Sequence, residues 1–557
     1  MKVNKILKIT AVALCGVMTL SGCIRETFPQ TSTVTQEQLG QSSAGLDASL
    51  KGIPSSLMLP SYDPSGNHGD FGYMAHGVWL DHMHHLITPC TVWSGGPQYA
   101  DRFQHPFYGF GMGSSGAYTY MLWYQNYPNI KNFNDMIAAV GDNEANAEYR
   151  GIAKTFRAML YMDMARLYDP LPAYAPDNGG YNTELEAVKE LTVPIVTETT
   201  TEKEAANNPR ATREEIFEFI FADLDDAAVC LENYVPTSPN YPSLAAVYAL
   251  YARAYLWLGG FEDGLYENVP TGKAAYELAA EYARKCIDEA GGAIMTEAEW
   301  TDPRTAFNTK ASSWIWCLQM STDTVYNNLI SFAAHMCPEG LYGYGIIAQP
   351  GVTKMMYERM SDTDFRKSVI YGPDMTYEDF KEHTTLSKEE FEGGDYKVSP
   401  YTNFKFRPNG GEHIDYMTAN AITYPLIRLE EMYFIEMEAT AHFNEAGAWD
   451  LLYAFMANRD SNYACKTQDL VNEIIFQKQV EFWGEGHTLY DFKRLNYGID
   501  TSNPQDYPVG GANFKAEGRL PWWNTVIPLG EIQVNLGIQA NNPDPSGALK
   551  SATALPE

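Results

Sequence analysis

The residues between Trp79 and Tyr108 combine aromatic rings with hydrogen-bonding side chains at short spacing. Glycine and proline at positions 95–97 interrupt them, which favours loops over regular structure. The C–H groups of a pyranose ring pack against an aromatic face, while its hydroxyls need donors and acceptors around the edge. The stretch therefore predicts a surface that binds sugars. Its candidate residues are Trp79, Asp81, His82, Trp93, Gln98, Tyr99, Asp101, Arg102, Phe107 and Tyr108.

A cluster of histidines at positions 82, 84 and 85 raises the alternative of a metal site. On a strand His82 and His84 share one face and His85 points away, and no nearby carboxylate has a diagnostic spacing. We therefore expect these rings to hydrogen-bond to a sugar or to the backbone. The sequence predicts no cofactor, although its acidity leaves open a structural calcium ion held by surface carboxylates.

Glu481 and Glu485 stand four residues apart and are candidates for a pair of catalytic carboxylates. Two carboxylates on one helical face do not straddle a glycosidic bond at the separations that hydrolysis needs. No nucleophile elbow, phosphate-binding loop or dinucleotide fingerprint stands out in the sequence. An enzyme is therefore not predicted.

The composition excludes some functions and favours others. The 557 residues include 39 Lys and Arg against 70 Asp and Glu, for a formal net charge of -31, which argues against broad binding to a nucleic-acid backbone. Hydrophobic residues make up 45% and charged residues 20%, so the chain can bury a core. The 37 Tyr and 11 Trp exceed what a core usually needs and indicate a binding surface.

The first residues have the features of an export signal. Lysines at positions 2, 5 and 8 precede an apolar segment, 9–20, that is too short to span a bilayer. The following Leu-Ser-Gly-Cys at 20–23 resembles the lipobox of bacterial lipoproteins. That resemblance implies cleavage before Cys23 and anchoring through acyl chains on this cysteine. The alternative is an ordinary cleaved signal with a chance cysteine.

Apolar residues at helical spacing predict a mostly α-helical chain. Small alanines beside large aromatics at 245–248 and 252–255 let helices approach closely, which is the packing of tetratricopeptide-like hairpins. A capping box of Thr212 and Glu215 marks one helix start. The apolar stretch 314–318 is a candidate strand with at least one core tryptophan. The expected helices cover 149–167, 212–231, 243–258, 273–290, 428–443 and 471–483.

Several blocks, in this order, resemble motifs of the SusD/RagB family, the surface lipoproteins of Bacteroidetes nutrient-uptake systems. FRAMLY at 156–161 is similar to the family's RA-x-x-Y helix, and RLEEMYFIEMEA at 428–439 is similar to its RLAEmyLi-x-AEA helix. EFWGEGH at 481–487 resembles the motif E-F-x-x-E-G-x-R. The remaining matches are at 166–172, 216–231, 490–494, 527–532, 535 and 541–543.

The resemblance implies a mostly α fold, in which a tetratricopeptide-like scaffold of helical hairpins carries a loop-rich, short-strand ligand-binding face. It implies a lipid-anchored protein exposed on the outer membrane of a Gram-negative cell. The implied partners are an oligosaccharide and a SusC-like TonB-dependent transporter, with no nucleic acid. The expected organisation is a signal peptide at 1–22, a lipidated flexible tether at 23–60, a SusD-like domain at 61–540 and a flexible tail at 541–557.

In this family the N-terminal loops and the loops after the mid-chain strand commonly supply the ligand face. The resemblance therefore places Trp93 and Tyr99 foremost, with Tyr342 and Tyr344 second. The alternative is that such aromatics fill the scaffold or face the transporter. Glu481 and Glu485 are expected to be structural partners of Lys493 and Arg494, and Trp522 and Trp523 are expected to be structural. The other predicted ligand-binding residues are Trp79, His82, Asp101 and Arg102.

The leading hypothesis is a cell-surface glycan-binding lipoprotein that delivers its ligand to the transporter. A peptide-capturing, RagB-like lipoprotein uses the same scaffold with another ligand. Two alternatives belong to other classes: a glycoside hydrolase, and a purely structural adaptor for the transporter.

Overall fold

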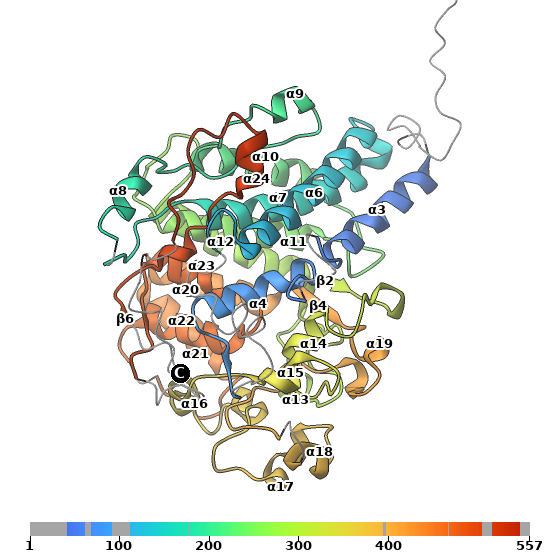
Figure 1. Ribbon diagram of the computed structural model, residues 1–557, viewed down its shortest axis with the longest axis vertical. Helices are drawn as coiled ribbons and strands as arrows, with labels where there is room; N and C mark the ends of the chain where they lie inside the picture. The colour runs from blue at the N-terminus through green and yellow to red at the C-terminus, as the bar shows by residue number, and fades with distance from the viewer. Residues whose placement is uncertain are drawn as a thin grey trace, which may run out of the picture.

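The computed structural model describes residues 40, 42–61, 68–91, 112–176, 178–393, 397–465, 467–503, 515–545 and 548. Long helices dominate the upper part and the left-hand middle of the molecule in Figure 1, and each packs against the next of the series. They are α6 (Ala117–Val140), α7 (Ala147–Tyr168), α10 (Arg213–Cys230), α11 (Leu244–Gly259), α12 (Lys273–Ala290), α20 (Leu429–Ala441) and α21 (Glu445–Met456). α22 (Leu470–Glu481) also packs on α20, and α23 (Thr488–Leu495) packs on α22.

The sequence signals for these helices are confirmed. At the start of α10 the Thr212 hydroxyl accepts a hydrogen bond from the Glu215 amide at 3.2 Å, and the Glu215 carboxylate accepts one from the Thr212 amide at 2.8 Å. α11 and α12 meet through small side chains, because Ala275, Ala279 and Ala283 of α12 are fully buried. This serial pairing is what a scaffold of helical hairpins requires. The closer likeness to tetratricopeptide repeats stays a prediction.

Two helices lie where irregular chain was expected. α3 (Ser43–Leu57) falls within the predicted tether, yet its Leu46, Leu50, Ile53 and Leu57 are buried and it packs on α6. Residues 62–128, which are dense in glycine and aromatics with few helical patterns, predict a loop-rich surface layer, but α6 begins inside it at Ala117. Its asparagines obscured the helical pattern, but they hydrogen-bond to backbone carbonyls within the fold, as Asn126 and Asn129 do at 2.6 Å. Those parts of the two predictions are wrong.

The predicted flexible tail is also packed at its beginning. Asn542 is 4% exposed, and its side chain donates to the carbonyl oxygens of Tyr168 and Thr525 at 2.8 Å. The rest of the tail beyond 545 is outside the described residues except for Ala548, which is buried. Among the described residues, no helix combines the length and apolar character that crossing a membrane requires.

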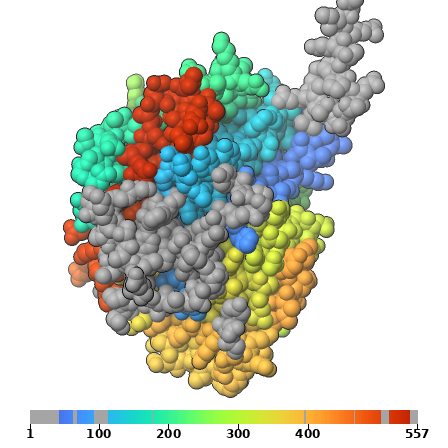
Figure 2. Space-filling model, viewed as in Figure 1, coloured from blue at the N-terminus to red at the C-terminus, as the bar shows by residue number. Residues whose placement is uncertain are grey.

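Short elements fill the chain between α12 and α20 and occupy the lower part of Figure 1, where Figure 2 shows them as one continuous yellow-to-orange surface. They are α13 (Glu297–Thr301), α14 (Phe332–Met336), α15 (Tyr344–Ala348), α16 (Lys354–Arg359), α17 (Tyr377–Phe380), α18 (Lys388–Glu392) and α19 (Tyr416–Ala419). The helices outside this segment are α4 (Tyr73–Met83), α8 (Tyr181–Glu186), α9 (Glu202–Ala205) and α24 (Leu529–Val534).

Three antiparallel strand pairs complete the described structure. β2 (Trp314–Gln319) pairs with β4 (Thr423–Arg428), which confirms the predicted strand. β1 (Thr88–Pro89) pairs with β3 (Pro350–Gly351), and β5 (Ile499–Asp500) pairs with β6 (Lys515–Ala516). The tryptophans expected to be structural are all buried: Trp314, Trp316, Trp522 and Trp523.

The turn after α22 requires glycine. Gly484 and Gly486 have φ of 82° and 77°, and a Cβ on Gly486 would lie 2.3 Å from the Cα of Gly77 in α4. The amides of both glycines donate to one carboxylate oxygen of Asp81, at 2.7 and 3.2 Å. Burial raises the pKa of Asp81 to about 8, so this side chain is largely protonated at neutral pH. Asp81 therefore joins α4 to the turn and is not a sugar contact.

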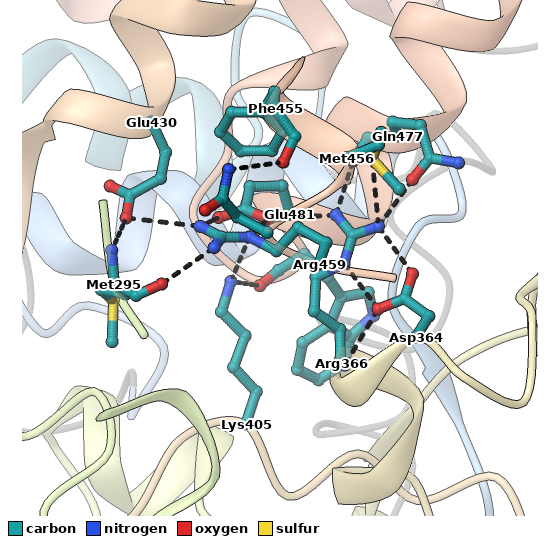
Figure 3. A network of polar contacts seen from close by, with 12 residues as sticks. Met295, Asp364, Arg366, Lys405, Glu430, Phe455, Met456, Arg459, Gln477 and Glu481 are labelled. Atoms are coloured by element: carbon teal, nitrogen blue, oxygen red, sulfur yellow. Dashed lines mark hydrogen bonds and ion pairs between the residues drawn. The ribbon is translucent and has the colours of Figure 1, made fainter. Parts of the chain in front are cut away.

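A buried ionic network joins α22 to the lower segment (Figure 3). Glu481, which is fully buried, pairs with Arg366 at 3.0 Å, Arg428 at 2.9 Å and Arg459 at 3.0 Å. Burial by itself raises the pKa of Glu481, but the three arginines outweigh it and hold that pKa well below its ordinary value. Lys405 extends the network by donating to the Glu481 carbonyl oxygen at 2.9 Å.

The expected pairing of Glu481 and Glu485 with Lys493 and Arg494 is wrong. Glu485 instead accepts from Lys405 at 2.6 Å and from Arg428. Lys493 donates to two backbone carbonyl oxygens at the end of α7, and Arg494 pairs with acidic groups of α20 and α23. The predicted structural role of the two glutamates is right, but their partners come from segments far away in the chain.

Replacing Glu481 with glutamine is expected to lower the free energy of unfolding by about 3–5 kcal/mol, because three buried guanidinium groups lose their shared counter-charge. Urea unfolding at pH 7 measures the change. Glu277→Gln is the matched control, since Glu277 pairs with Lys273 on the exposed side of α12 and should contribute less than about 1 kcal/mol. Equal effects of the two substitutions would contradict the structural role of Glu481.

The network also predicts a pH dependence. Because the pKa of Glu481 is lowered on folding, its stabilisation is present above the ordinary glutamate pKa of about 4.3 and is lost progressively as the pH falls below it. The unfolding midpoint of the Glu481→Gln variant should therefore fall less steeply below pH 4.3 than that of the native chain. Parallel curves would show that the carboxylate charge has no such role.

Candidate functional site

The sequence-predicted site residues fall into two groups. Outside the described residues lie Trp93, Tyr99, Asp101 and Arg102, and the lipidation candidate Cys23. Within the described part lie Trp79, His82, Tyr342 and Tyr344. The structure therefore gives the geometry of the second group and of the chain on either side of 92–111.

α4 carries two of the predicted residues. Trp79 is 1% exposed and meets the Tyr118 ring edge-on, with centroids 5.7 Å apart. A ring so deeply buried offers no face to a ligand, so this placement opposes the expected sugar contact and makes Trp79 part of the core. His82 lies half-buried in the last turn of the helix, where its carbonyl oxygen accepts a hydrogen bond from the His85 amide.

Tyr342 is half-buried and fixed by the polar groups around it. Its hydroxyl donates to the Asn420 side-chain oxygen at 2.9 Å, and its carbonyl oxygen accepts from the Asn328 side chain at 3.4 Å. The Tyr416 ring lies beside it, with centroids 6.4 Å apart. Asn420 in turn donates to the carbonyl oxygen of Asn327, next to Tyr326. Three loops thus meet at Tyr342.

Tyr344 is held in a cluster of rings. Its hydroxyl is 2.5 Å from Nδ1 of His68, and its ring contacts those of His68 and His335. Nε2 of His335 lies 2.9 Å from the His68 carbonyl oxygen and 3.0 Å from that of Leu329, and its ring stacks on Phe71. The segment around 68–71 is thereby joined to α14 and α15.

The chain enters residues 92–111 beside α15. β1 pairs with β3, and the Thr91 hydroxyl donates to the carbonyl oxygen of Ile347 in α15. Gln349, at a φ of 50°, is fully buried and accepts at its side-chain oxygen from the Ser399 amide at 2.8 Å. These contacts bring the last described residue before 92 into the same region as Tyr344, although the two are far apart in the chain.

We call this region the aromatic face and define it by residues Tyr326, Tyr342, Tyr344, Tyr416 and His68. Tyr326 is 50% exposed, and the other four rings are half-buried. Burial raises the pKa of Tyr342 well above its ordinary value, and its single hydroxyl proton is donated to Asn420, so the hydroxyl can offer a ligand only its oxygen as an acceptor. The face therefore offers apolar rings together with hydroxyl and amide groups, and carries no buried charge of its own.

Sequence reasoning named Tyr342 and Tyr344 as candidates and did not name their neighbours Tyr326, Tyr416 and Asn420. The pattern Tyr-Asn-Asn at 326–328 is typical of a polar loop and carries a weak signal for a site. Only the fold brings this loop to Tyr342. Among the described residues, no group of three or more His, Cys, Asp or Glu side chains is arranged to hold a metal ion.

A family model described as "Starch-binding associating with outer membrane", of the SusD-like type, matches residues 110–256. The fold is shared with solved SusD-like structures along about nine tenths of the chain. Residues 110–256 are therefore similar to the SusD-like family, and the chain has the SusD-like fold. The matched segment contains α6, α7, α10 and most of α11, which belong to the helical scaffold. The residues of the aromatic face lie outside it.

Three solved structures illustrate the shared SusD fold. A SusD-like carbohydrate binding protein from Bacteroides vulgatus has 20% identity and a TM-score of 0.66, with 89% of this chain and 97% of that chain covered. A SusD superfamily protein from Bacteroides thetaiotaomicron has 17% identity, a TM-score of 0.62 and coverage of 92% and 100%. A SusD-like carbohydrate binding protein from Bacteroides fragilis has 13% identity and a TM-score of 0.62, with 90% of this chain and 100% of that chain covered. No curated protein matches the chain.

The packing of His335 predicts how the face responds to acid. Burial lowers the pKa of His335 to about 3, so the folded chain keeps this ring neutral while the unfolded chain protonates it near pH 6.5. Its contribution to stability is present above pH 6.5 and is lost as the pH falls from there towards 3. Between pH 7 and pH 5 the loss amounts to about 2 kcal/mol.

His335→Gln keeps a side-chain amide for the two carbonyl acceptors but does not titrate. Its free energy of unfolding, measured in urea at pH 7 and pH 5, should fall by about 2 kcal/mol less than that of the native chain. The same pH dependence in both chains would contradict a neutral, buried His335.

Proposed function

We propose that this protein is a SusD/RagB family member that binds an oligosaccharide and passes it to a SusC-like TonB-dependent transporter. The observation that carries the proposal is the aromatic face, in which loops from distant parts of the chain hold tyrosines partly exposed with their polar groups fixed. Rings that are rigid before binding lose little conformational entropy on binding, which suits weak contacts to sugar rings. The names of the SusD-like carbohydrate binding proteins that share the fold support this ligand class.

The place of action follows from the sequence and the family. A lipoprotein anchored through Cys23 on the outer surface of the outer membrane would meet a polysaccharide before any transporter does. The family description, with its outer-membrane association, supports this location. The domain limits 61–540, with a lipidated segment before them, belong to the same proposal, corrected for α3. Pull-down of the transporter from detergent-solubilised membranes tests the partnership.

Tyr326→Ala is expected to weaken binding of the preferred glycan about tenfold, or about 1.4 kcal/mol, because the exposed ring is removed. Affinity electrophoresis against a polysaccharide panel identifies the ligand, and calorimetry measures the change. Tyr453→Ala is the matched control, since Tyr453 is 46% exposed on α21, away from the face, and should bind normally. Equal affinities of native chain, Tyr326→Ala, Trp93→Ala and Tyr99→Ala would reject the assignment of the face.

Binding without chemical change is the second expectation. Glu481 and Glu485, the pair considered for hydrolysis, form buried ion pairs with Arg428 and Lys405 inside the protein. Overnight incubation of the purified chain with each glycan that it binds should release no new reducing ends. Release of reducing ends that scales with protein concentration would favour the hydrolase. Binding to protein digests but to no glycan would favour peptide capture.

A further inference from the structure

A cavity of about 540 Å³ lies between α16, the 3₁₀ helix Phe365–Val369, α21 and α22. We call it the second cavity to distinguish it from the aromatic face. Its size is within the range of ordinary ligand pockets. It shares no lining residue with the aromatic face. Neither the family resemblance nor the ligand face explains it.

The floor of this cavity is the edge of the ionic network shown in Figure 3. Asp364 and Gln477 line the cavity, and Arg366 behind them donates to both, at 2.7 Å and 2.6 Å. Met456 also lines it and contacts the same guanidinium. Because Arg366 is fully enclosed, these three side chains are fixed before any ligand arrives.

One wall is equally ordered. Glu473 accepts from Arg359 at 2.6 Å, from the Tyr463 hydroxyl at 2.9 Å and from Gln477 at 2.9 Å. The Arg359 guanidinium stacks on the Phe476 ring, 3.6 Å from its centroid. The wall therefore presents a flat, partly apolar surface whose own charges are balanced.

Asp460 differs from the other buried carboxylates of this cavity, because it has no ion-pair partner among the described residues. It is 3% exposed, and its Oδ1 accepts hydrogen bonds from the Thr363 hydroxyl and from the Asn462 amide. Its Oδ2 accepts none, and no basic side chain in the described part of the chain pairs with it. A buried carboxylate without a counter-charge is costly, so an oxygen left open towards a cavity marks a place for a donor.

The charges around the cavity point to the kind of donor. Asp362 pairs with Lys367 at 2.6 Å, while Glu473 and Asp364 have the arginine partners described above. Glu358 and Asp460 remain without an ion-pair partner among the described residues, which leaves the cavity negative. The acidic lining residues are Glu358, Asp362, Asp364, Asp460 and Glu473, against the basic Arg359 and Lys367.

We propose that this cavity binds a protonated amino sugar, with its ammonium group on Asp460 Oδ2. The exposed Asn462 side chain and the Ser361 hydroxyl line the same cavity and supply partners for ring hydroxyls, and Tyr463 supplies an aromatic wall. The choice of a saccharide rather than another amine rests on the proposed glycan function. The aromatic face, which has no such carboxylate, would bind neutral sugar units at the same time.

Calorimetry at pH 6 with the whole chain tests the proposal with two probes that share a sugar backbone and differ in N-acetylation, and therefore in charge. The fully deacetylated glucosamine tetramer carries ammonium groups, and its N-acetylated counterpart does not. We expect the charged tetramer to bind at least tenfold more tightly and its affinity to fall as salt is added. Equal binding of the two tetramers would overturn the proposal.

Asp460→Asn keeps an oxygen for Thr363 and Asn462 but replaces the open Oδ2 with an amide. It should weaken binding of the charged tetramer at least tenfold, whereas Asp288→Asn on exposed α12 should not change it. If Asp460→Asn does not fold, Glu358→Gln on the exposed rim gives a second reading and should weaken binding severalfold. Unchanged affinity in a folded Asp460→Asn variant would overturn the site. If Asp460→Asn does not fold, unchanged affinity in Glu358→Gln would overturn it.

Two further measurements separate this inference from the proposed function. Tyr326→Ala should weaken neutral glycan binding about tenfold and leave binding of the charged tetramer unchanged, so failure at the aromatic face leaves the cavity result standing. Tetralysine presents the same ammonium group on a peptide. If tetralysine binds as tightly as the charged tetramer and is equally sensitive to Asp460→Asn, the cavity recognises basic peptides and the amino-sugar assignment is wrong.

Discussion

The charge of Glu481 is the constraint on which the lower half of the structure depends. One fully buried carboxylate holds three arginines that come from the 3₁₀ helix Phe365–Val369, from β4 and from the turn after α21. None of these groups can leave its partners without leaving a buried charge uncompensated. The short helices and loops of the segment between α12 and α20 bury apolar side chains of their own, among them Trp300, Phe307, Phe380, Phe391 and Phe406. The electrostatic junction joins this part of the core to α22.

That junction is also connected along the chain to the two proposed ligand surfaces. Arg428, at the end of β4, belongs to the network, and Tyr416 and Asn420 lie just before the same strand. The opposite edge of the network, at Arg366, forms the floor of the second cavity. The helical scaffold thus provides a rigid support, the ionic network transfers its rigidity to the loops, and the loops present tyrosines and carboxylates to solvent.

The sequence predicted the scaffold well because its signals are local. The capping box at Thr212 and the apolar spacing after it specify α10 without any knowledge of the rest of the fold. α3 and α6 were missed since glycine, proline and asparagine interrupt their patterns, and some partners of the asparagines, such as Ser56 for Asn129 and the Val196 carbonyl oxygen for Asn134, come from distant segments. The partners of Glu481 could not be predicted for a related reason, because their spacing in the chain carries no information about contact.

The same distinction applies to the site. Tyr342 and Tyr344 were predicted from family resemblance, and their role as ligand contacts stays a prediction. Tyr326, which lies on a neighbouring loop, and Asp460, which lines a separate cavity, have no local pattern that distinguishes them from ordinary surface residues. Trp79, the opposite case, is an aromatic in a promising stretch that the fold assigns to the core. Aromatic composition therefore predicts a binding surface, and the fold decides which rings are exposed enough to take part in it.

The central claim, that the aromatic face binds a glycan, is tested most directly by a crystal structure of the chain with the tightest-binding oligosaccharide from a polysaccharide panel. The account predicts that a sugar ring lies within about 4 Å of the ring of Tyr326, Tyr342 or Tyr344, which is van der Waals contact. A sugar bound elsewhere with the face empty, or the absence of any glycan that binds, would contradict it.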